Sequence, residues 1–420
     1  MLKRLHLLLA LFILTVNAAM AQITTSGISG KITSDGENVI GATVTAIHQP
    51  SGTVYRAVTN IDGRYTIQGM RPGGPYKVDI SYIGYKDKVI KNLNLSLGET
   101  ENISCSLQED AHQLQEVVVS GKAGLAASRT GAATSMTAEQ INNMPSITHG
   151  IADVARLNPQ LTVTNSGNMS FAGVNNRYNN FMIDGAANND VFGLASSGNN
   201  GGQAGAQPVS METIEQIQVS VAPFDVRQSG FTGGAINAIT KSGTNQFHGS
   251  AYYYGYNQDL IGTKYPYLDG TGYAPKYQKQ TQYNMGVTLG GPIIKNKLFF
   301  FANYERTNKE YPNLYGVDSG NSKVNTEQAK DILTMLQNIA EKQGVNFNDY
   351  YSNQDIYTKS DKAGLKLDWN INEFNKFAIR WSLVKAEQLS GGGSASSLNS
   401  YGYSYPFKSN TNSFIAELQS

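Results

Sequence analysis

The sequence has little cysteine, little net charge and few long apolar runs, and each shortage excludes a class of protein. Cys105 is the only cysteine in 420 residues, which excludes a disulfide framework. The formal net charge is +1, so a nucleic-acid partner is not expected. After residues 5–16, no stretch approaches the roughly 20 apolar residues that a membrane-spanning helix needs. If the chain enters a membrane, it must therefore do so with strands that close into a barrel.

Catalytic signatures are also missing. The chain contains neither a Gly-x-Ser-x-Gly elbow nor a Gly-x-x-x-x-Gly-Lys-Ser/Thr loop, and residues 241–244 match only part of the second. No histidine stands in the His-x-x-Glu spacing of a zinc carboxypeptidase. Asp184 and Asp190 could serve as calcium ligands, but a turn explains Asp184 at least as well. We expect no enzymatic activity, no cofactor and no bound metal.

What is present begins with an export signal. Lys3 and Arg4 precede the apolar residues 5–16, and Ala19, Met20 and Ala21 provide a small-residue cleavage site. Residues 1–21 are therefore predicted to be a signal peptide that is removed before Gln22. The residue directly after this cleavage site is Gln22 and not cysteine, so a lipoprotein anchor is not expected.

Residues 22–108 have the pattern of a small β-sandwich. Apolar and polar residues alternate along 42–47, 64–67 and 76–80. Turn residues at 35–36, 62–63 and 72–75 separate these runs. Short strands joined by turns at this spacing indicate two packed sheets.

From residue 247 the alternation becomes regular and continues to the last residues. Along 283–290 one face is apolar, formed by Tyr283, Met285, Val287 and Leu289. The same contrast returns in 363–369 and 376–383. A soluble β-sandwich would show the same alternation, so the lengths of the connections are needed to distinguish it from a membrane barrel. Those at 291–297 and 370–375 are short and those around 257–280, 309–356 and 386–410 are long, which is typical of an outer-membrane barrel with short periplasmic turns.

The barrel strands are too few to close. We count about six strands, near 247–256, 282–290, 298–306, 362–369, 376–384 and 412–419. A barrel that encloses a plug has about 22 strands, and an open sheet edge in lipid leaves backbone groups unpaired. Residues 414–420 lie within an alternating run, so we expect this chain to be an N-terminal fragment of a larger barrel.

Three segments carry a resemblance to a family. They are the Gly-rich run 222–245, the Ile-Asp-Gly turn at 183–185 and the run Ile-Glu-Gln-Ile-Gln-Val at 214–219. With the strands that follow, they resemble the TonB-dependent outer-membrane receptors of the SusC/Oar-like branch. Residues 41–44, 59–65, 74–76 and 82–85 are similar to the carboxypeptidase-regulatory-like domain at the front of such receptors.

The resemblance implies a mainly β fold in five segments. These are a signal peptide at 1–21, a carboxypeptidase-regulatory-like β-sandwich at 22–108, a linker at 109–122, a small α+β plug at 123–245, and the first strands of a large antiparallel transmembrane β-barrel at 246–420. Inside the plug, Thr137 and Gln140 predict a capping box, and Pro159 ends a second helix that begins near Ile151. Strands are predicted at 160–164, 181–184 and 215–220, and loops over 165–208.

The resemblance also implies two sites. It places the TonB box, a strand that pairs with the TonB protein, at Glu116, Val117, Val118 and Val119. A strand of the sandwich or of the plug is the alternative interpretation of these residues. Outward-facing plug loops help to bind ligands in this family, which makes candidates of Asn175, Arg177, Tyr178, Asn188, Asn189 and Asp190. The alternative interpretation is that each of these residues lies in a solvated loop and forms an Asx turn without binding a ligand.

The function that the resemblance implies is energy-coupled uptake through the outer membrane of a Gram-negative bacterium, with the sandwich in the periplasm. The expected partners are TonB with its inner-membrane energising complex, outer-membrane lipid and an unknown extracellular ligand, and a surface lipoprotein is a further candidate. One alternative is a surface adhesion or secretion-linked protein of the Oar-like kind without nutrient import. A second is a soluble periplasmic binding module, which would leave the later strands without a purpose.

Overall fold

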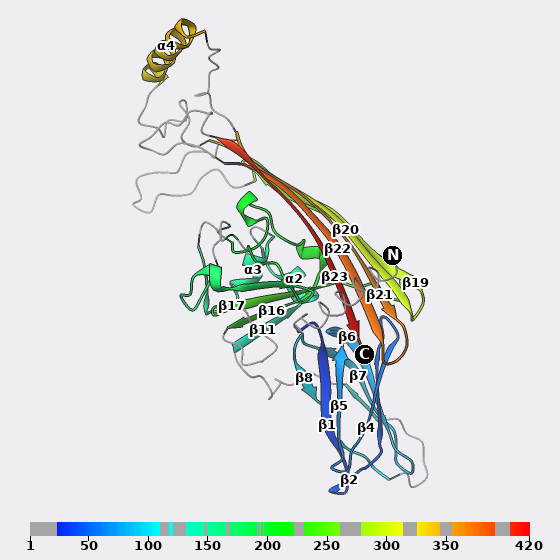
Figure 1. Ribbon diagram of the computed structural model, residues 1–420. Coiled ribbons are helices and arrows are strands. Elements are labelled where there is room, and N and C mark those ends of the chain that lie inside the picture. The colour runs from blue at the N-terminus through cyan, green and yellow to red at the C-terminus, as the bar shows by residue number, and fades with distance from the viewer. Residues whose placement is uncertain are drawn as a thin grey trace, which may run out of the picture.

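The computed structural model describes residues 23–109, 117–120, 132–146, 149–164, 169–190, 192, 195, 197–221, 231–260, 279–313, 326–344, 355–390 and 404–420. The predicted signal peptide lies outside these residues. The described chain forms three β-rich bodies, which we call the sandwich, the plug and the barrel sheet. Figure 1 shows the plug beside one face of the barrel sheet, with the sandwich below both.

The sandwich consists of two sheets with one core between them. The first sheet contains β1 (Ser26–Ser34), β2 (Glu37–Asn38), β5 (Arg64–Met70), β8 (Thr100–Asn102) and β9 (Cys105–Ser106). The second has the order β10 (Val117–Ser120), β7 (Lys88–Leu95), β6 (Gly73–Ser81), β3 (Thr43–His48), β4 (Thr53–Val58). Ile28, Ile32, Tyr76 and Ile80 are fully buried in the core between the sheets. Tyr76 and Ile80 belong to the alternating runs that predicted strands, whereas β1, which carries Ile28 and Ile32, was not predicted.

The plug is a five-stranded sheet with two short helices. Its strand order is β11 (Ala132–Thr137), β16 (Ile214–Val221), β17 (Gly234–Thr240), β14 (Asn180–Ile183), β15 (Ala186–Ala187). The helices are α2 (Ala138–Asn143), which begins with the predicted capping box of Thr137 and Gln140, and α3 (Ile151–Ala155). Fully buried Phe171, Ile151, Ile214 and Ile217 fill the core.

Four strands of the described plug were not predicted, namely β11, β13, β15 and β17. The segment 165–208, expected to be loops, contains β13 (Met169–Phe171), which pairs with β12 (Leu161–Val163). A three-residue strand is too short to show a period, so sequence alone did not reveal it. The strand β17 lies in the Gly-rich run and is buried along its whole length, so it lacks the polar alternation of a half-buried strand.

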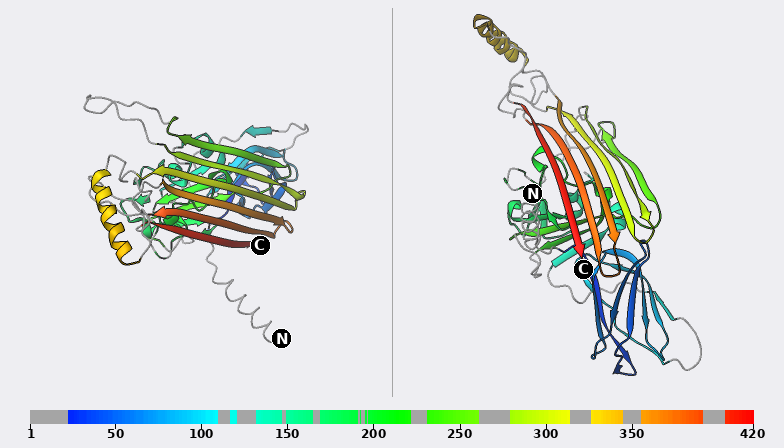
Figure 2. Two further views of the ribbon diagram at one scale, coloured as in Figure 1. Left: turned by 90° about the horizontal axis from the view of Figure 1, so that it is seen from above. Right: turned by 45° about the vertical axis from the view of Figure 1, so that its right-hand side comes forward.

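The barrel sheet has six antiparallel strands in chain order, as Figure 2 shows. They are β18 (His248–Asn257), β19 (Thr281–Ile294), β20 (Leu298–Pro312), β21 (Asp355–Asn370), β22 (Lys376–Ser390) and β23 (Tyr405–Gln419). The predicted faces are confirmed, because Leu365, Trp369 and Ile379 are exposed on the outer side while Asp368 and Arg380 are buried against the plug side. Within the described residues the sheet does not close, and β18 and β23 are its edges.

Strands β20 to β23 are longer than predicted at the ends beside the long connections, and β19 extends to Ile294, into the short connection predicted at 291–297. The connection between β20 and β21 is long, as expected, but it contains an unpredicted helix, α4 (Thr326–Lys342). Among the described residues, no helix has the length and apolar character needed to cross a membrane.

Candidate functional site at the plug–barrel interface

The plug carboxylate Asp184 is held by two cations of the barrel sheet. Asp184 lies in the tight turn between β14 and β15, with φ +45°. Its Oδ2 accepts hydrogen bonds from Arg380 Nη1 at 2.9 Å and Thr240 Oγ1 at 2.6 Å, and Lys366 Nζ lies 3.7 Å from Oδ1. Burial alone would raise the pKa of Asp184, but Lys366, Arg380 and Thr240 outweigh it and keep the pKa below its ordinary value. The carboxylate therefore stays charged and joins the plug to β21 and β22.

A second polar contact joins the plug to the barrel sheet closer to the long loops. Glu305 of β20 and Lys362 of β21 form a buried ion pair with an Nζ–Oε1 distance of 2.6 Å. Ser210 of the plug donates its hydroxyl to Glu305 Oε2 at 2.6 Å, and Tyr252 of β18 donates to the same oxygen at 2.7 Å. A buried charge pair needs such additional bonds to offset the cost of leaving water.

A third contact involves Glu212 of the plug. Tyr254 of β18 donates its hydroxyl to Glu212 Oε1 at 2.9 Å, and His149 Nε2 lies 3.7 Å from the same oxygen. The rings of His149 and Tyr254 lie against each other, with centroids 4.1 Å apart. The contact with His149 is the main cause that lowers the pKa of Glu212, despite burial, and Tyr254 adds to it. The plug is therefore attached to the barrel sheet mainly through charged and polar groups.

The only apolar cluster found between the described parts of plug and barrel sheet is small. It joins Ala204 and Ala206 of the plug to Val384, Ala386 and Phe407. This cluster lies next to the short helix η2 (Gly202–Ala204).

The sandwich, the plug and the barrel sheet meet around a cavity of about 180 Å³. Arg71 of the sandwich pairs with Asp368 of β21 at 3.2 Å, and Asn370 Nδ2 donates to Thr53 Oγ1 at 3.0 Å. The charged lining is balanced, with four basic residues (Arg71, Lys366, Lys376, Arg380) and four acidic residues (Asp184, Glu215, Asp368, Glu417). Because the basic and acidic residues are equal in number, the lining carries no net formal charge.

The residues predicted as the TonB box lie at the edge of the sandwich. Val117, Val118 and Val119 belong to β10, which pairs in parallel with β7 so that Val118 lies opposite Val89. Glu116 lies outside the described residues. Among the described strands, β10 has β7 as its single neighbour, so one of its edges is open to another strand.

The six candidate ligand residues lie in two adjacent plug loops. Asn175, Asn189 and Asp190 accept hydrogen bonds from the backbone amides of Arg177, Phe181 and Phe192 at 3.0, 2.7 and 3.1 Å. Arg177 and Tyr178 are exposed. Asn188 Oδ1 is buried and has no hydrogen-bond partner among the described residues.

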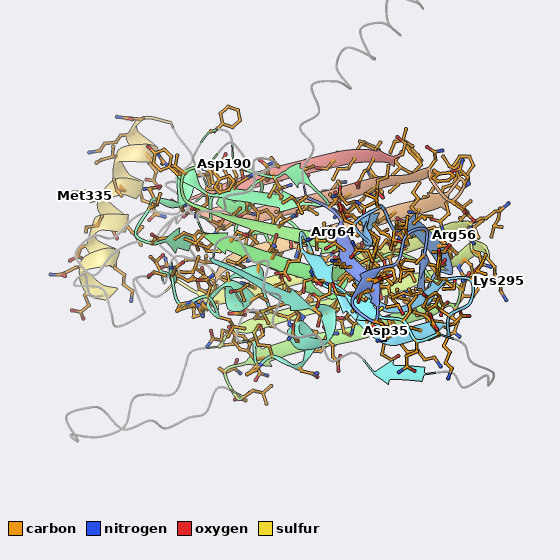
Figure 3. The ribbon with its side chains drawn as sticks, turned by 90° about the horizontal axis from the view of Figure 1, so that it is seen from below. Asp35, Arg56, Arg64, Asp190, Lys295 and Met335 are labelled. Atoms are coloured by element: carbon orange, nitrogen blue, oxygen red, sulfur yellow. The ribbon has the colours of Figure 1, made fainter. Side chains whose placement is uncertain are left out.

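The two loops meet at Gly198, whose carbonyl accepts from the Asp190 amide at 3.0 Å. A Cβ at Gly198 would lie 3.1 Å from the carbonyl oxygen of Asn176. Figure 3 places Asp190 at the end of the molecule that carries Met335 of α4, away from Arg56 and Lys295. The candidates are thus on the side of the long barrel loops. No group of three or more potential metal ligands occurs in the described part of the chain.

Sequence reasoning missed the residues that attach the plug. Lys366, Asp368 and Arg380 were predicted to be on the polar face of their strands, but nothing in the pattern showed that they contact Asp184 or Arg71. Glu305 and Lys362 were not singled out. A charged residue on the inner face of a membrane strand is the signal that could have identified them, since such a charge must find a partner.

Comparisons with known proteins agree with this architecture. Three family models match: a carboxypeptidase regulatory-like domain at residues 27–108, a TonB-dependent receptor plug domain at 126–236 and an outer membrane beta barrel domain at 239–319. The TonB-dependent transporter Oar of Myxococcus xanthus is 29% identical over 259 residues, which cover 59% of this chain and 23% of Oar. A probable TonB-dependent siderophore receptor, PirA of Acinetobacter baumannii, is 25% identical over 188 residues, which cover 41% of this chain and 22% of that protein.

Among solved structures, the outer membrane transporter YddB of Escherichia coli aligns with a TM-score of 0.48 at 13% identity, over 68% of this chain and 36% of YddB. The chain spans less than a quarter of the length of the two curated relatives. The family models and Oar together confirm the resemblance that the sequence motifs indicated. The chain thus has the domain organisation of the TonB-dependent outer-membrane receptors, with an N-terminal carboxypeptidase-regulatory-like domain, a receptor plug domain and part of an outer-membrane barrel, and it is similar to the transporter Oar of that family.

Proposed function

We propose that this chain supplies the plug and part of the barrel of a receptor that imports a ligand across the outer membrane with energy from TonB. The observation that carries this proposal is the chemistry of the plug attachment. Asp184, Glu212 and Ser210 hold the plug through ion pairs and hydrogen bonds. Water can replace such contacts when the plug moves, whereas a large apolar interface would hold it permanently.

The proposed organisation follows the segments expected from sequence. Residues 1–21 direct export and are removed, 22–108 form a periplasmic domain, 109–122 form the linker with the TonB box, 123–245 form the plug, and 246–420 contribute strands to the barrel in outer-membrane lipid. TonB and its inner-membrane energising complex are the partners. The family consists of receptors and transporters, so we propose no catalytic role.

The open edge of β10 supports Glu116 to Val119 as the TonB box. A strand with a free edge can accept another strand by backbone pairing, which is the mode called β-augmentation. Because β10 is the last strand of its sheet, TonB could pair with it while β7 keeps its own bonds. The backbone provides most of the affinity in this mode, and side chains contribute less.

Two neighbouring proline substitutions in the full-length receptor test this assignment. Successive amides along a strand point to opposite edges, so Val118→Pro and Val119→Pro remove donors from different edges. We expect one of them to reduce binding of the purified periplasmic domain of TonB by at least about tenfold. Val118→Thr, which keeps the amide and the extended backbone, should bind nearly as well as the parent. Equal binding by both proline variants and the parent would show that the box lies elsewhere.

The ligand site is proposed to include Asn175, Arg177, Tyr178, Asn188, Asn189 and Asp190. The exposed Arg177 and Tyr178 are the best placed to touch a ligand, whereas Asn175, Asn189 and Asp190 also stabilise their loops. The siderophore receptor among the relatives makes a ferric siderophore the first ligand class to test. Arg177→Ala and Tyr178→Ala should weaken binding of such a ligand without changing receptor abundance, and unchanged affinity in both variants would remove this loop from the site.

A further inference from the structure

The hydrogen bonds between the sandwich and the plug join neutral, buried groups, and one charged side chain, Glu215 of β16, also lies against Gly73 of the sandwich. Gln216 of β16 accepts a hydrogen bond from the Leu97 amide at 2.8 Å and donates to the Leu95 carbonyl at 2.9 Å. Gln218 donates to the Leu97 carbonyl at 2.9 Å. Both glutamines are almost completely buried. Three apolar side chains form a cluster at the same interface: Ile23, Leu97 and Ile239.

The contact between the sandwich and the barrel sheet has a different chemistry. Arg71 pairs with Asp368 at 3.2 Å, and Arg56 pairs with Glu373 at 2.7 Å with both side chains about half exposed. Thr24 donates its hydroxyl to Glu417 at 2.7 Å. Among the described residues, ion pairs and polar bonds therefore dominate this second contact, as they do between the plug and the barrel sheet.

These two chemistries respond differently when the surfaces separate. Charged groups that reach water when the surfaces separate recover much of their hydration, which offsets much of the attraction they lose, and the half-exposed pair of Arg56 and Glu373 holds its partners weakly even before separation. Neutral side chains clustered with apolar groups lose both their bonds and the benefit of burial. The surface facing the barrel sheet is therefore the weaker of the two.

We propose that the sandwich and the plug form one unit, and that this unit separates from the barrel along the charged surface. The sandwich lies below the plug and beside the lower ends of the barrel strands (Figure 1). It therefore acts as a periplasmic lid that moves away from the barrel strands together with the plug. The cohesion of the unit does not depend on TonB or on a ligand. Its role during transport rests on the proposed function.

Hydrogen exchange of two backbone amides in the purified full-length receptor tests the proposal. The Leu97 amide, bonded to Gln216, reports on the contact between sandwich and plug. The Asn245 amide, in the connection from the plug to β18, donates to the Pro50 carbonyl at 2.8 Å. Because the Asn245 side chain is bonded to Asn296 in the turn between β19 and β20, this amide reports on the contact between the sandwich and the barrel sheet.

Raising the salt from about 0.1 M to about 1 M shortens the Debye length from about 10 Å to about 3 Å and should weaken the half-exposed pair of Arg56 and Glu373. The buried pair of Arg71 and Asp368 is screened less and is tested by substitution.

We expect high salt to accelerate exchange at Asn245 by roughly threefold or more and to leave Leu97 unchanged. Asp368→Asn should have the same effect at low salt because it removes the partner of Arg71. Asp361→Asn is the matched control, since Asp361 is on the same strand but pairs with Arg306. Gln216→Leu should instead accelerate hydrogen exchange of the Leu97 amide, because it removes the partner of that amide.

The proposal is overturned if Leu97 exchanges faster than Asn245 at high salt, or if the two amides accelerate together. It is also overturned if Asp361→Asn acts like Asp368→Asn. Because neither TonB nor a ligand is present, these results are independent of the import proposal.

Discussion

Asp184 shows how one side chain can attach a domain. Its carboxylate bonds to Thr240 within the plug and to Arg380 and Lys366 of the barrel sheet. The turn that presents it needs a residue at positive φ, which aspartate tolerates better than most residues. The Ile-Asp-Gly motif thus fixes a charge as well as a turn, and this second role could not be read from the sequence.

We predict that Asp184→Asn weakens the attachment of the plug. The amide has the same shape, but it leaves Arg380 and Lys366 buried without their anion, a change that typically costs about 3–5 kcal/mol for a buried pair. The urea midpoint for loss of protection of plug amides should fall in the full-length receptor. The exposed Asp87→Asn serves as the control, and a midpoint equal to that of the parent would show that Asp184 does not hold the plug.

His48 makes the sandwich sensitive to acid. Burial, assisted by Arg71, lowers the pKa of His48 to about 3, while its Nδ1 lies 2.7 Å from the Ser51 hydroxyl. An unfolded histidine has a pKa of about 6.5, so below that pH the unfolded state binds a proton that the folded state does not. The stability is complete above pH 6.5 and declines as the pH falls toward 3.

In the full-length receptor the sandwich should therefore lose about 2 kcal/mol of unfolding free energy between pH 7 and pH 5. Urea denaturation at the two pH values measures this loss. His48→Asn should be less stable at pH 7 but should show a smaller dependence on pH. Parallel pH profiles for the parent and the variant would contradict the assignment.

At the scale of elements, alternation predicted the strands and their faces. The exposed Leu365 and Trp369 and the buried Asp368 lie on the faces that period-two alternation indicates. The partners of the inner charges were not predictable, because Asp184 and Arg380 are 196 residues apart in the sequence. Helix α4 was not predicted, because only the length of the connection that contains it entered the prediction.

Close packing explains Gly234, whose role could not be inferred from the pattern of apolar and polar residues. A Cβ at Gly234 of β17 would overlap the ring of Phe171, which is completely buried. We predict that Gly234→Ala destabilises the plug by about 1–3 kcal/mol through overpacking. Adding Phe171→Leu should recover part of this loss in a double-mutant cycle measured by urea denaturation of the receptor. Strictly additive effects would mean that the two residues do not interact.

At the scale of the whole molecule, the three bodies differ in independence. The sandwich has its own core of buried side chains around Tyr76, whereas the barrel sheet has unpaired edges at β18 and β23 within the described residues. The sequence predicted that the sandwich would be self-contained and that six barrel strands would leave open edges, and the second prediction rested on the number of strands alone. It could not predict how the bodies contact one another, because the contacts depend on single polar residues such as Gln216 and Arg71.

Residues 22–110 expressed alone should give a soluble, monomeric β domain. Residues 246–420 expressed alone should aggregate or be degraded, since open edges with apolar faces pair with other chains. Circular dichroism and gel filtration distinguish these outcomes. A compact, heat-modifiable outer-membrane species formed by the 420-residue chain would refute the expectation that more strands are required.

The position of β11 determines how the plug would respond to mechanical load. β11 is the edge strand of the plug sheet and is joined to β16 by six residue pairs, from Ala132 opposite Val221 to Thr137 opposite Gln216. Among the described residues, the hydrogen bonds of the plug to the sandwich come from β16 and β17, through Gln216, Gln218 and Asn237. Tension on the chain before Ala132 would therefore load the pairs between β11 and β16 first. The plug would begin to unravel at its first strand, while β16 and β17 remain attached to the sandwich.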